Sequence, residues 1–301
     1  MNKFSSIKQL IVEQLSSALP CSKLNLLNHQ KHIPKFNEVS GLSSQNFQLT
    51  LGDKQYLIVP LITDQEKQKL GVNLKHQIRA IQRVSSDTFA PTLIYHNQYY
   101  AMFNWVDGKS LDQLLDFKCD DIFLLKIALI QSKIHSSPLS KRDILLKPLF
   151  ESLLSSVMHS RRTYSLIKIH KKMLGSPYPK KSRWVFDHMD MHLGNIIQSK
   201  NDLVLIDWEY SANVEQNFAF CSLFNSLQLS QKQKLFYLTA YHHHAMHPDA
   251  FTEHSIKQKL ADIDEWQLWY DYLCHLWYEI RFSQTQDSVY LKYINNSKIC
   301  I

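Results

Sequence analysis

The stretch that decides the fold is His188-Met189-Asp190-Met191-His192-Leu193-Gly194-Asn195, followed shortly by Leu203-Val204-Leu205-Ile206-Asp207. Ile196-Ile197 opens a second apolar run directly after the first stretch, and Ser199-Lys200-Asn201-Asp202 supplies polar turn residues. Two short apolar runs joined by polar turn residues predict a β-hairpin.

This hairpin would place oxygen-bearing side chains at its open end. Asn195 precedes its first strand and Asp207 follows its second, so the two become cross-strand neighbours roughly 5 Å apart. An amide oxygen and a carboxylate at that spacing suit magnesium. Asp190 lies on the loop that enters the same end, and it can accept a hydrogen bond from a substrate hydroxyl.

The chain on either side of this stretch has two characters. Up to about residue 106, short apolar runs predict strands at 47–51, 55–59, 93–95 and 99–105, with one helix at 70–84. After Asp107-Gly108, helical periodicity dominates, as at 111–115, 122–135 and 149–159. The pattern predicts an α+β protein with a small antiparallel-sheet lobe over residues 1–106 and a larger helical lobe over 107–301.

Composition narrows the class of protein. The 301 residues carry a net charge of +7, but Lys and Arg are spread along the chain, so a nucleic-acid partner is not expected. The five cysteines form no C-x-x-C pair, which indicates reduced thiols in a cytoplasm. No apolar run reaches the length of a membrane span. The first 20 residues predict an amphipathic helix, because Glu13 and Gln14 interrupt the apolar stretch.

The pattern H-x-D-x-x-x-x-N with a later Asp resembles the phosphoryl-transfer motif of the protein-kinase-like superfamily. With its flank Trp208-Glu209-Tyr210, it is most similar to thiamine kinases, within the aminoglycoside phosphotransferase/choline kinase family. The similarity runs from about residue 38 to 292 and includes Gly41-Leu42-Ser43, Gln77-Ile78-Arg79-Ala80 and Trp277-Tyr278-Glu279-Ile280-Arg281.

The resemblance implies a two-lobed kinase fold, a monomer in the cytoplasm, ATP and Mg²⁺ as cofactors, and a role for particular residues. Asp190 would be catalytic, while Asn195 and Asp207 would hold the metal. His188 would brace the catalytic loop. The nucleotide would be bound by the loop residues Gly41, Ser43 and Ser44 and by the hinge residues Asn104, Trp105 and Val106.

The acceptor implied by the resemblance is a small cationic alcohol such as thiamine or choline, which calls for aromatic faces and carboxylates. Trp208, Glu209, Trp277 and Glu279 are the residues expected to contact it. Trp277 also belongs to an apolar stripe, at 266, 270, 273, 277 and 280, for which core packing is the favoured interpretation. The residues His242 to His244 with His247 favour a helix surface or loop over a zinc site.

Three positions depart from the family pattern. Val59 stands where a Lys or Arg would meet the nucleotide phosphates, Gln77 where its Glu partner would lie, and Asn217 where an Asp is usual. The preferred hypothesis is an ATP-dependent kinase of the thiamine hydroxyethyl group. The alternatives are a choline or amino-sugar kinase and a catalytically weak, kinase-like binding protein.

Overall fold

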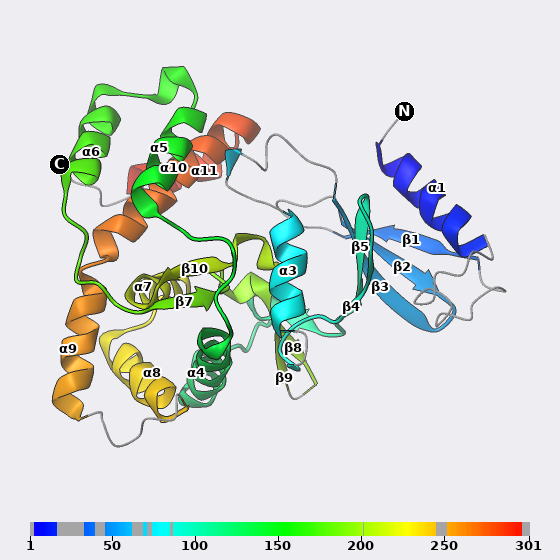
Figure 1. Cartoon of the computed structure of the whole chain (residues 1–301), viewed down its shortest axis with the longest axis horizontal. Coiled ribbons are helices and arrows are strands. Elements are labelled where there is room, and N and C mark those ends of the chain that lie inside the picture. The colour runs from blue at the N-terminus through cyan, green and yellow to red at the C-terminus, as the bar shows by residue number, and fades with distance from the viewer. Residues whose placement is uncertain are drawn as a thin grey trace.

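The computed structural model has two lobes, a β-sheet lobe and a larger helical lobe, with α3 (Leu74–Val84) beside the sheet (Figure 1). The described residues are 3–16, 33–39, 46–61, 69–70, 74–84, 87–200, 202–244 and 252–296. This arrangement confirms the predicted α+β fold, with an antiparallel-sheet lobe and a larger helical lobe. The boundary at residues 106 and 107 stays a prediction.

The smaller lobe is built on a five-stranded antiparallel sheet with the order β1-β2-β3-β5-β4. Its strands are β1 (Lys35–Glu38), β2 (Phe47–Leu51), β3 (Lys54–Pro60), β4 (Leu93–His96) and β5 (Tyr100–Asn104). All four strands expected from the sequence are present, since alternation of apolar and polar residues is a local signal.

Each face of this sheet has its own apolar core. Ile58 and Met102 point to the face covered by α1 (Lys3–Ser16), where they pack in one cluster with Ile7. Val59 and Phe103 point to the opposite face and join the cluster that contains the apolar side of α3. The alternation of side chains along β3 therefore places Val59 on the side of the sheet that faces α3 and the helical lobe.

A crossing segment joins the sheet lobe to a small three-stranded sheet of order β6-β8-β9. It passes through Gly108, whose φ is 147°, a conformation that side-chain-bearing residues rarely adopt. A Cβ there would lie 2.2 Å from the carbonyl oxygen of Gln198, so glycine lets the chain approach β8. The strands are β6 (Lys109–Ser110), β8 (Ile196–Ser199) and β9 (Asp202–Leu205).

The larger lobe consists mainly of helices around one apolar core. α4 (Asp121–Ser136) and α8 (Gln231–His244) lie side by side, next to the two-stranded pair of β7 (Trp184–Asp187) and β10 (Ala212–Glu215). The other helices are α5 (Leu146–Ser156), α6 (Tyr164–Gly175), α7 (Gln216–Ser226), α9 (Glu253–Asp264), α10 (Gln267–Thr285) and α11 (Ser288–Asn296).

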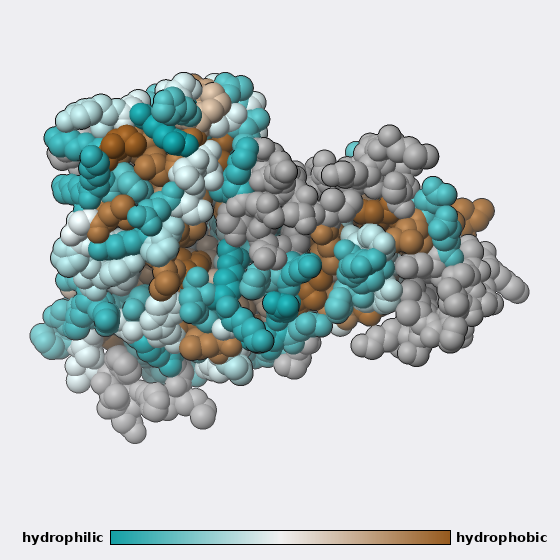
Figure 2. Space-filling view, turned by 45° about the horizontal axis from the view of Figure 1, so that its top comes forward, coloured by the Kyte–Doolittle hydropathy of each residue, from teal (hydrophilic) through white to brown (hydrophobic). Residues whose placement is uncertain are grey.

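The surface of this lobe has no single dominant apolar patch on the face seen in Figure 2, where apolar residues stand in separate groups among hydrophilic ones. Within the part of the chain that the structure describes, no helix is long and apolar enough to cross a membrane. The predicted helices at 122–135 and 149–159 correspond to α4 and α5. The predicted helix at 111–115 is only a short 3-10 turn over Leu111–Gln113.

Candidate active site

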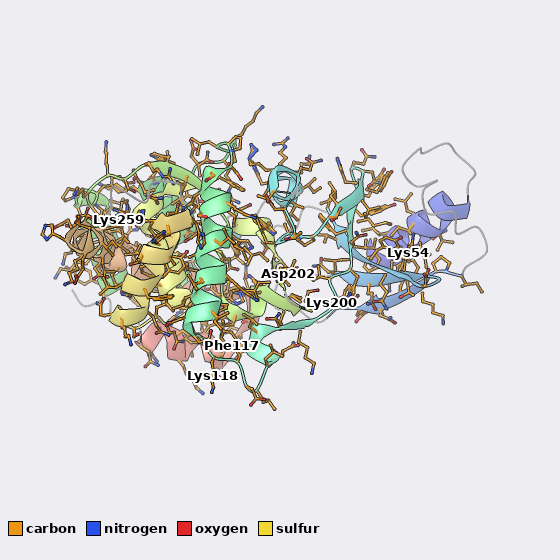
Figure 3. All side chains as sticks on the ribbon, turned by 90° about the horizontal axis from the view of Figure 1, so that it is seen from below. Lys54, Phe117, Lys118, Lys200, Asp202 and Lys259 are labelled. Carbon is orange, nitrogen blue, oxygen red and sulfur yellow. The ribbon has the colours of Figure 1, made fainter. Side chains whose placement is uncertain are left out.

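The predicted hairpin is confirmed, and its register brings the two expected metal ligands together. Ile196 on β8 is the partner of Leu205 on β9. One step beyond, the Ile206 N–H donates to the Asn195 carbonyl oxygen at 2.9 Å, so Asn195 and Asp207 flank the open end of the hairpin. The hairpin tip, marked by Lys200 and Asp202, lies between the lobes in the view of Figure 3.

Asp207 sits in a left-handed backbone conformation, with φ 61° and ψ 64°. Asp tolerates this region better than most residues, but at a cost of about 1–2 kcal/mol. The backbone turns sharply here into a 3-10 turn at Trp208–Tyr210. Strain of this kind is typical of functional sites held in place by the surrounding fold.

Asp190 is tied directly to Asn195. The Asn195 amide nitrogen donates to Asp190 Oδ2 at 2.9 Å and to the Asp190 carbonyl oxygen at 3.0 Å. Because the nitrogen is engaged in this way, the amide oxygen of Asn195 is the atom left to face a cation. The Asp190 side chain keeps 33% of its surface exposed. Burial nevertheless raises the pKa of its carboxyl group, with Glu209 adding to the rise and His192 opposing it.

His188 links the Asp190 loop to the hairpin. Its Nε2 lies 2.9 Å from the Ile206 carbonyl oxygen and must donate to it, so Nδ1 carries no proton and accepts from the Asp190 N–H at 3.3 Å. Burial lowers the pKa of His188 to about 4, which keeps the ring neutral at neutral pH. These bonds are those that a bracing residue needs, and the bracing role stays a prediction.

Trp208 differs from expectation. The side chain is fully buried, its Nε1–H donates to the Leu205 carbonyl oxygen at 2.9 Å, and its ring stacks on Phe186. With no exposed surface it has no face to offer an acceptor. Trp208 is therefore a core residue that supports the hairpin, and the predicted contact with the acceptor is corrected.

Tyr210, which the sequence analysis did not select, lies among the carboxylates of the site. Burial raises its pKa, and the charges of Glu209, Asp190 and Asp207 raise it further. Trp277 of α10 donates its Nε1–H to the Tyr210 hydroxyl at 3.1 Å. The site is thus locally acidic and carries aromatic rings, although the chain as a whole is basic.

The other two expected acceptor contacts are more enclosed. Glu209 is 2% exposed, and its carbonyl oxygen accepts from Arg142 at 2.9 Å. Glu279 is 4% exposed, and its two carboxylate oxygens accept from Arg161 at 2.8 and 2.9 Å. The structure therefore pairs Glu279 with Arg161, and a direct bond from Glu279 to an acceptor would have to displace that guanidinium. Neither arginine was selected from the sequence.

The nucleotide side of the site is described in part. Gly41, Ser43 and Ser44 lie outside the described residues. Of the hinge residues, Asn104 donates its N–H to Thr92 and Trp105 donates to Gln55. The Val106 N–H has no hydrogen-bond partner among the described residues.

Val59, whose side chain faces α3, carries no charge. Val59 is 3% exposed and packs in the same cluster as Ile78 and Ile81, while Gln77 is 7% exposed. Lys54 is the first residue of β3 and pairs with Leu51 of β2, in the small lobe (Figure 3).

The donor set at the hairpin fits a magnesium ion bound together with a phosphorylated ligand. Asn195 and Asp207 provide an amide oxygen and a carboxylate, and Mg²⁺ commonly takes few protein oxygens beside waters and substrate phosphates. Among the described residues, no group of three or more His, Cys, Asp or Glu could hold a metal alone. His242 to His244 end α8, as expected for a helix surface, and His247 lies outside the described residues.

Comparisons with known proteins place these features in a family. A model of the choline/ethanolamine kinase family matches residues 39–267. A thiamine kinase from Escherichia coli O157:H7 is 22% identical over 285 residues, which cover 91% of this chain and 93% of that protein. A thiamine kinase from Escherichia coli K12 is 25% identical over 167 residues, covering 53% and 54%.

Solved structures give the same architecture. Choline kinase LicA from Streptococcus pneumoniae superposes with a TM-score of 0.69 at 16% identity, covering 97% of each chain. An ethanolamine kinase from Plasmodium vivax gives a TM-score of 0.68 at 14% identity, covering 99% of this chain and 94% of that one.

Proposed function

Because the chain belongs to the choline/ethanolamine kinase family, we propose that it transfers the γ-phosphoryl group of ATP to the hydroxyethyl oxygen of thiamine. The observation that carries the proposal is the meeting of Asp190, Asn195 and Asp207 at the open end of one hairpin. Phosphoryl transfer depends on positioning and on charge stabilisation, and these residue types supply both.

Asp190 would accept the proton of the acceptor hydroxyl as its oxygen attacks phosphorus. The Asn195 amide nitrogen holds the Asp190 carboxylate from one side, which fixes its direction. The raised pKa of Asp190 makes it a better proton acceptor than an ordinary aspartate. Asn195 and Asp207 would hold Mg²⁺, which when bound neutralises charge on the phosphates.

ATP would bind between the lobes, with its base at the hinge. LicA, one of the structural neighbours, has been solved in complex with AMP. In this chain the Val106 N–H would donate to the adenine ring, and the loop with Gly41, Ser43 and Ser44 would cover the phosphates. Val59 offers these phosphates no charge, so a high KM for ATP is expected.

The acceptor proposed is a cationic alcohol, because the acceptor side of the site is both acidic and aromatic. The carboxylates of Asp190, Asp207 and Glu209 act together on Tyr210, and Trp277 contacts the same hydroxyl. A positively charged ring is attracted by carboxylates and by aromatic faces. Thiamine is preferred because a thiamine kinase aligns with 91% of the chain.

Choline is the second candidate, and a specific observation favours it. The same acidic, aromatic wall suits a quaternary ammonium group, and choline kinase LicA shares the fold along the whole chain. The two acceptors differ in size and in polar atoms rather than in charge, so a direct comparison is needed.

The test is a panel of acceptors with ATP and magnesium. We expect ADP formation to saturate with thiamine at lower concentration than with choline or an aminoglycoside. Saturation at a lower concentration of choline or of an aminoglycoside than of thiamine would make that compound the acceptor. Thiamine binding without ADP formation over long incubation would favour a kinase-like binding protein.

A further inference from the structure

A buried carboxylate outside the expected catalytic set contacts the catalytic loop. Asp187 ends β7, lies directly before His188 and is 1% exposed. Its Oδ1 accepts from the Met189 N–H at 2.7 Å, and its Oδ2 accepts from Gln131 at 2.9 Å and from His135 Nε2 at 2.8 Å. Gln131 and His135 are four residues apart on α4, so one face of that helix holds the carboxylate.

Two tyrosines of α8 in turn hold Gln131 and His135 in place. The Tyr237 hydroxyl donates to Gln131 Oε1, and the Tyr241 hydroxyl lies 2.7 Å from His135 Nδ1. Burial lowers the pKa of His135, so the ring is neutral, with its proton on the nitrogen that faces Asp187. Burial alone would raise the pKa of Asp187, but the hydrogen bonds from His135 and its other donors lower it, so the carboxylate stays ionised.

The loop that Asp187 contacts is held in an unfavourable conformation. Met189 has φ 66°, in the left-handed region that a side-chain-bearing residue seldom adopts. Such a residue persists only where its surroundings hold it. The hydrogen bond from Met189 to Asp187 is the local restraint, and the next residue is Asp190.

We propose that Asp187 is a positioning residue for the catalytic loop, held by Gln131 and His135 and, through them, by the hydroxyls of Tyr237 and Tyr241. The assignment rests on the proposed function, because it takes Asp190 to be the catalytic residue. Asp187 touches no reacting atom and acts through the backbone of Met189. Helices α4 and α8 thereby help to determine the position of Asp190.

The test compares two tyrosine variants, each of which loses a hydroxyl that is hydrogen-bonded to a buried histidine. Tyr241→Phe removes the hydroxyl that holds His135. Tyr272→Phe removes a hydroxyl that lies 2.8 Å from Nδ1 of another buried histidine, His170, in the same lobe. Tyr272→Phe loses this one hydrogen bond, whereas Tyr241→Phe also removes the acceptor of Gln216 and Arg183, which donate to the Tyr241 hydroxyl at 3.1 and 3.2 Å. Tyr241→Phe should therefore have the lower melting temperature. Asp187→Asn is the third variant, and all assays are run well below the lowest melting temperature.

We expect kcat to fall about fivefold in Tyr241→Phe, the equivalent of one buried hydrogen bond, with KM for ATP unchanged. Asp187→Asn should lower kcat roughly 100-fold. An amide nitrogen in place of Oδ2 would face the donors of Gln131 and His135, and it could no longer hold the neutral His135 tautomer. Tyr272→Phe should keep kcat within about twofold, since its hydroxyl bonds to His170 and not to a residue that contacts Asp187.

Hydrogen exchange of the segment 187–195 gives a readout that does not need activity. Tyr241→Phe and Asp187→Asn should both speed exchange of this segment, and Tyr272→Phe should not. Equal kcat and equal exchange in the two tyrosine variants would overturn the positioning role. A parent protein that forms no ADP with any acceptor would instead defeat the proposed function, and the exchange result would still decide the role of Asp187.

Discussion

At the scale of single residues, Asp190 carries the central role in the proposed chemistry. Asp190→Asn keeps the shape of the side chain but removes its capacity to accept the hydroxyl proton. We expect ADP formation to fall by roughly 100-fold or more, while nucleotide binding persists. The measurement is the steady-state rate of ADP release, with nucleotide affinity determined by titration on the same preparation. Turnover close to that of the parent would remove Asp190 from the role of proton acceptor.

The two proposed metal ligands, Asn195 and Asp207, are expected to contribute unequally. Asp207→Ala removes a full charge and should abolish magnesium-dependent nucleotide binding, whereas Asn195→Ala removes a neutral amide and should weaken it less. Asn195→Ala has a second effect, because the same amide holds the Asp190 carboxylate at 2.9 Å and kcat should also fall. Calorimetric titration with ATP, with and without magnesium, measures the effect on binding, and the rate of ADP release at saturating ATP measures the effect on kcat. Parent-like binding of MgATP by both variants would contradict the assignment of the hairpin site.

At the scale of elements, the hairpin and the sheet could be predicted because their signals are local. Apolar runs with polar turn residues between them fix β8, β9, β2 and β3, and the alternation along β3 decides which face Val59 takes. The pairing of Glu279 with Arg161 joins residues 118 positions apart, and no local pattern reveals it. The burial of Trp208 was also missed, since a tryptophan beside a motif has the same sequence signal in a core as in a pocket.

The strand β3 provides a test of how this chain binds phosphates. Val59→Arg places a guanidinium on the face of β3 that packs against α3. A charge-assisted contact between this group and the nucleotide phosphates would contribute about 1.5–3 kcal/mol. We expect a several-fold lower KM for ATP. The melting temperature should fall, because Val59 is buried among apolar side chains. Adding Gln77→Glu should lower KM further by orienting the new side chain.

Val59→Met is the matched control, since it adds length without charge. It should leave KM for ATP unchanged while altering the melting temperature. A lower melting temperature in Val59→Arg with no gain over Val59→Met in KM would show that position 59 does not face the phosphates.

At the scale of the whole molecule, neutral histidines that are buried or half-buried make stability depend on pH. Burial lowers the pKa of His242 to about 4, with Lys259 and Arg183 adding to the effect. The unfolded chain takes up this proton near pH 6.5 and the folded chain does not, so stability is lost as pH falls from about 6.5 towards 4. The melting temperature should therefore drop between about pH 7 and pH 5.

His242→Gln should reduce that drop, and His243→Gln, at the exposed neighbouring position, should leave it as in the parent. Other buried histidines, including His135 and His170, contribute in the same direction. An identical drop in the parent and in His242→Gln would assign the pH dependence to those residues alone.

The carboxylates around Tyr210 make the proposed acceptor side of the site acidic, within a chain of net charge +7. This contrast leads to the claim that the acceptor is a cationic alcohol and, first among those, thiamine. Mass spectrometry of thiamine incubated with ATP, magnesium and the parent protein tests it most directly. The account predicts thiamine monophosphate carrying one added phosphoryl group, formed by the parent and not by Asp190→Asn. Unmodified thiamine, from a preparation that phosphorylates choline or an aminoglycoside under the same conditions, would contradict it.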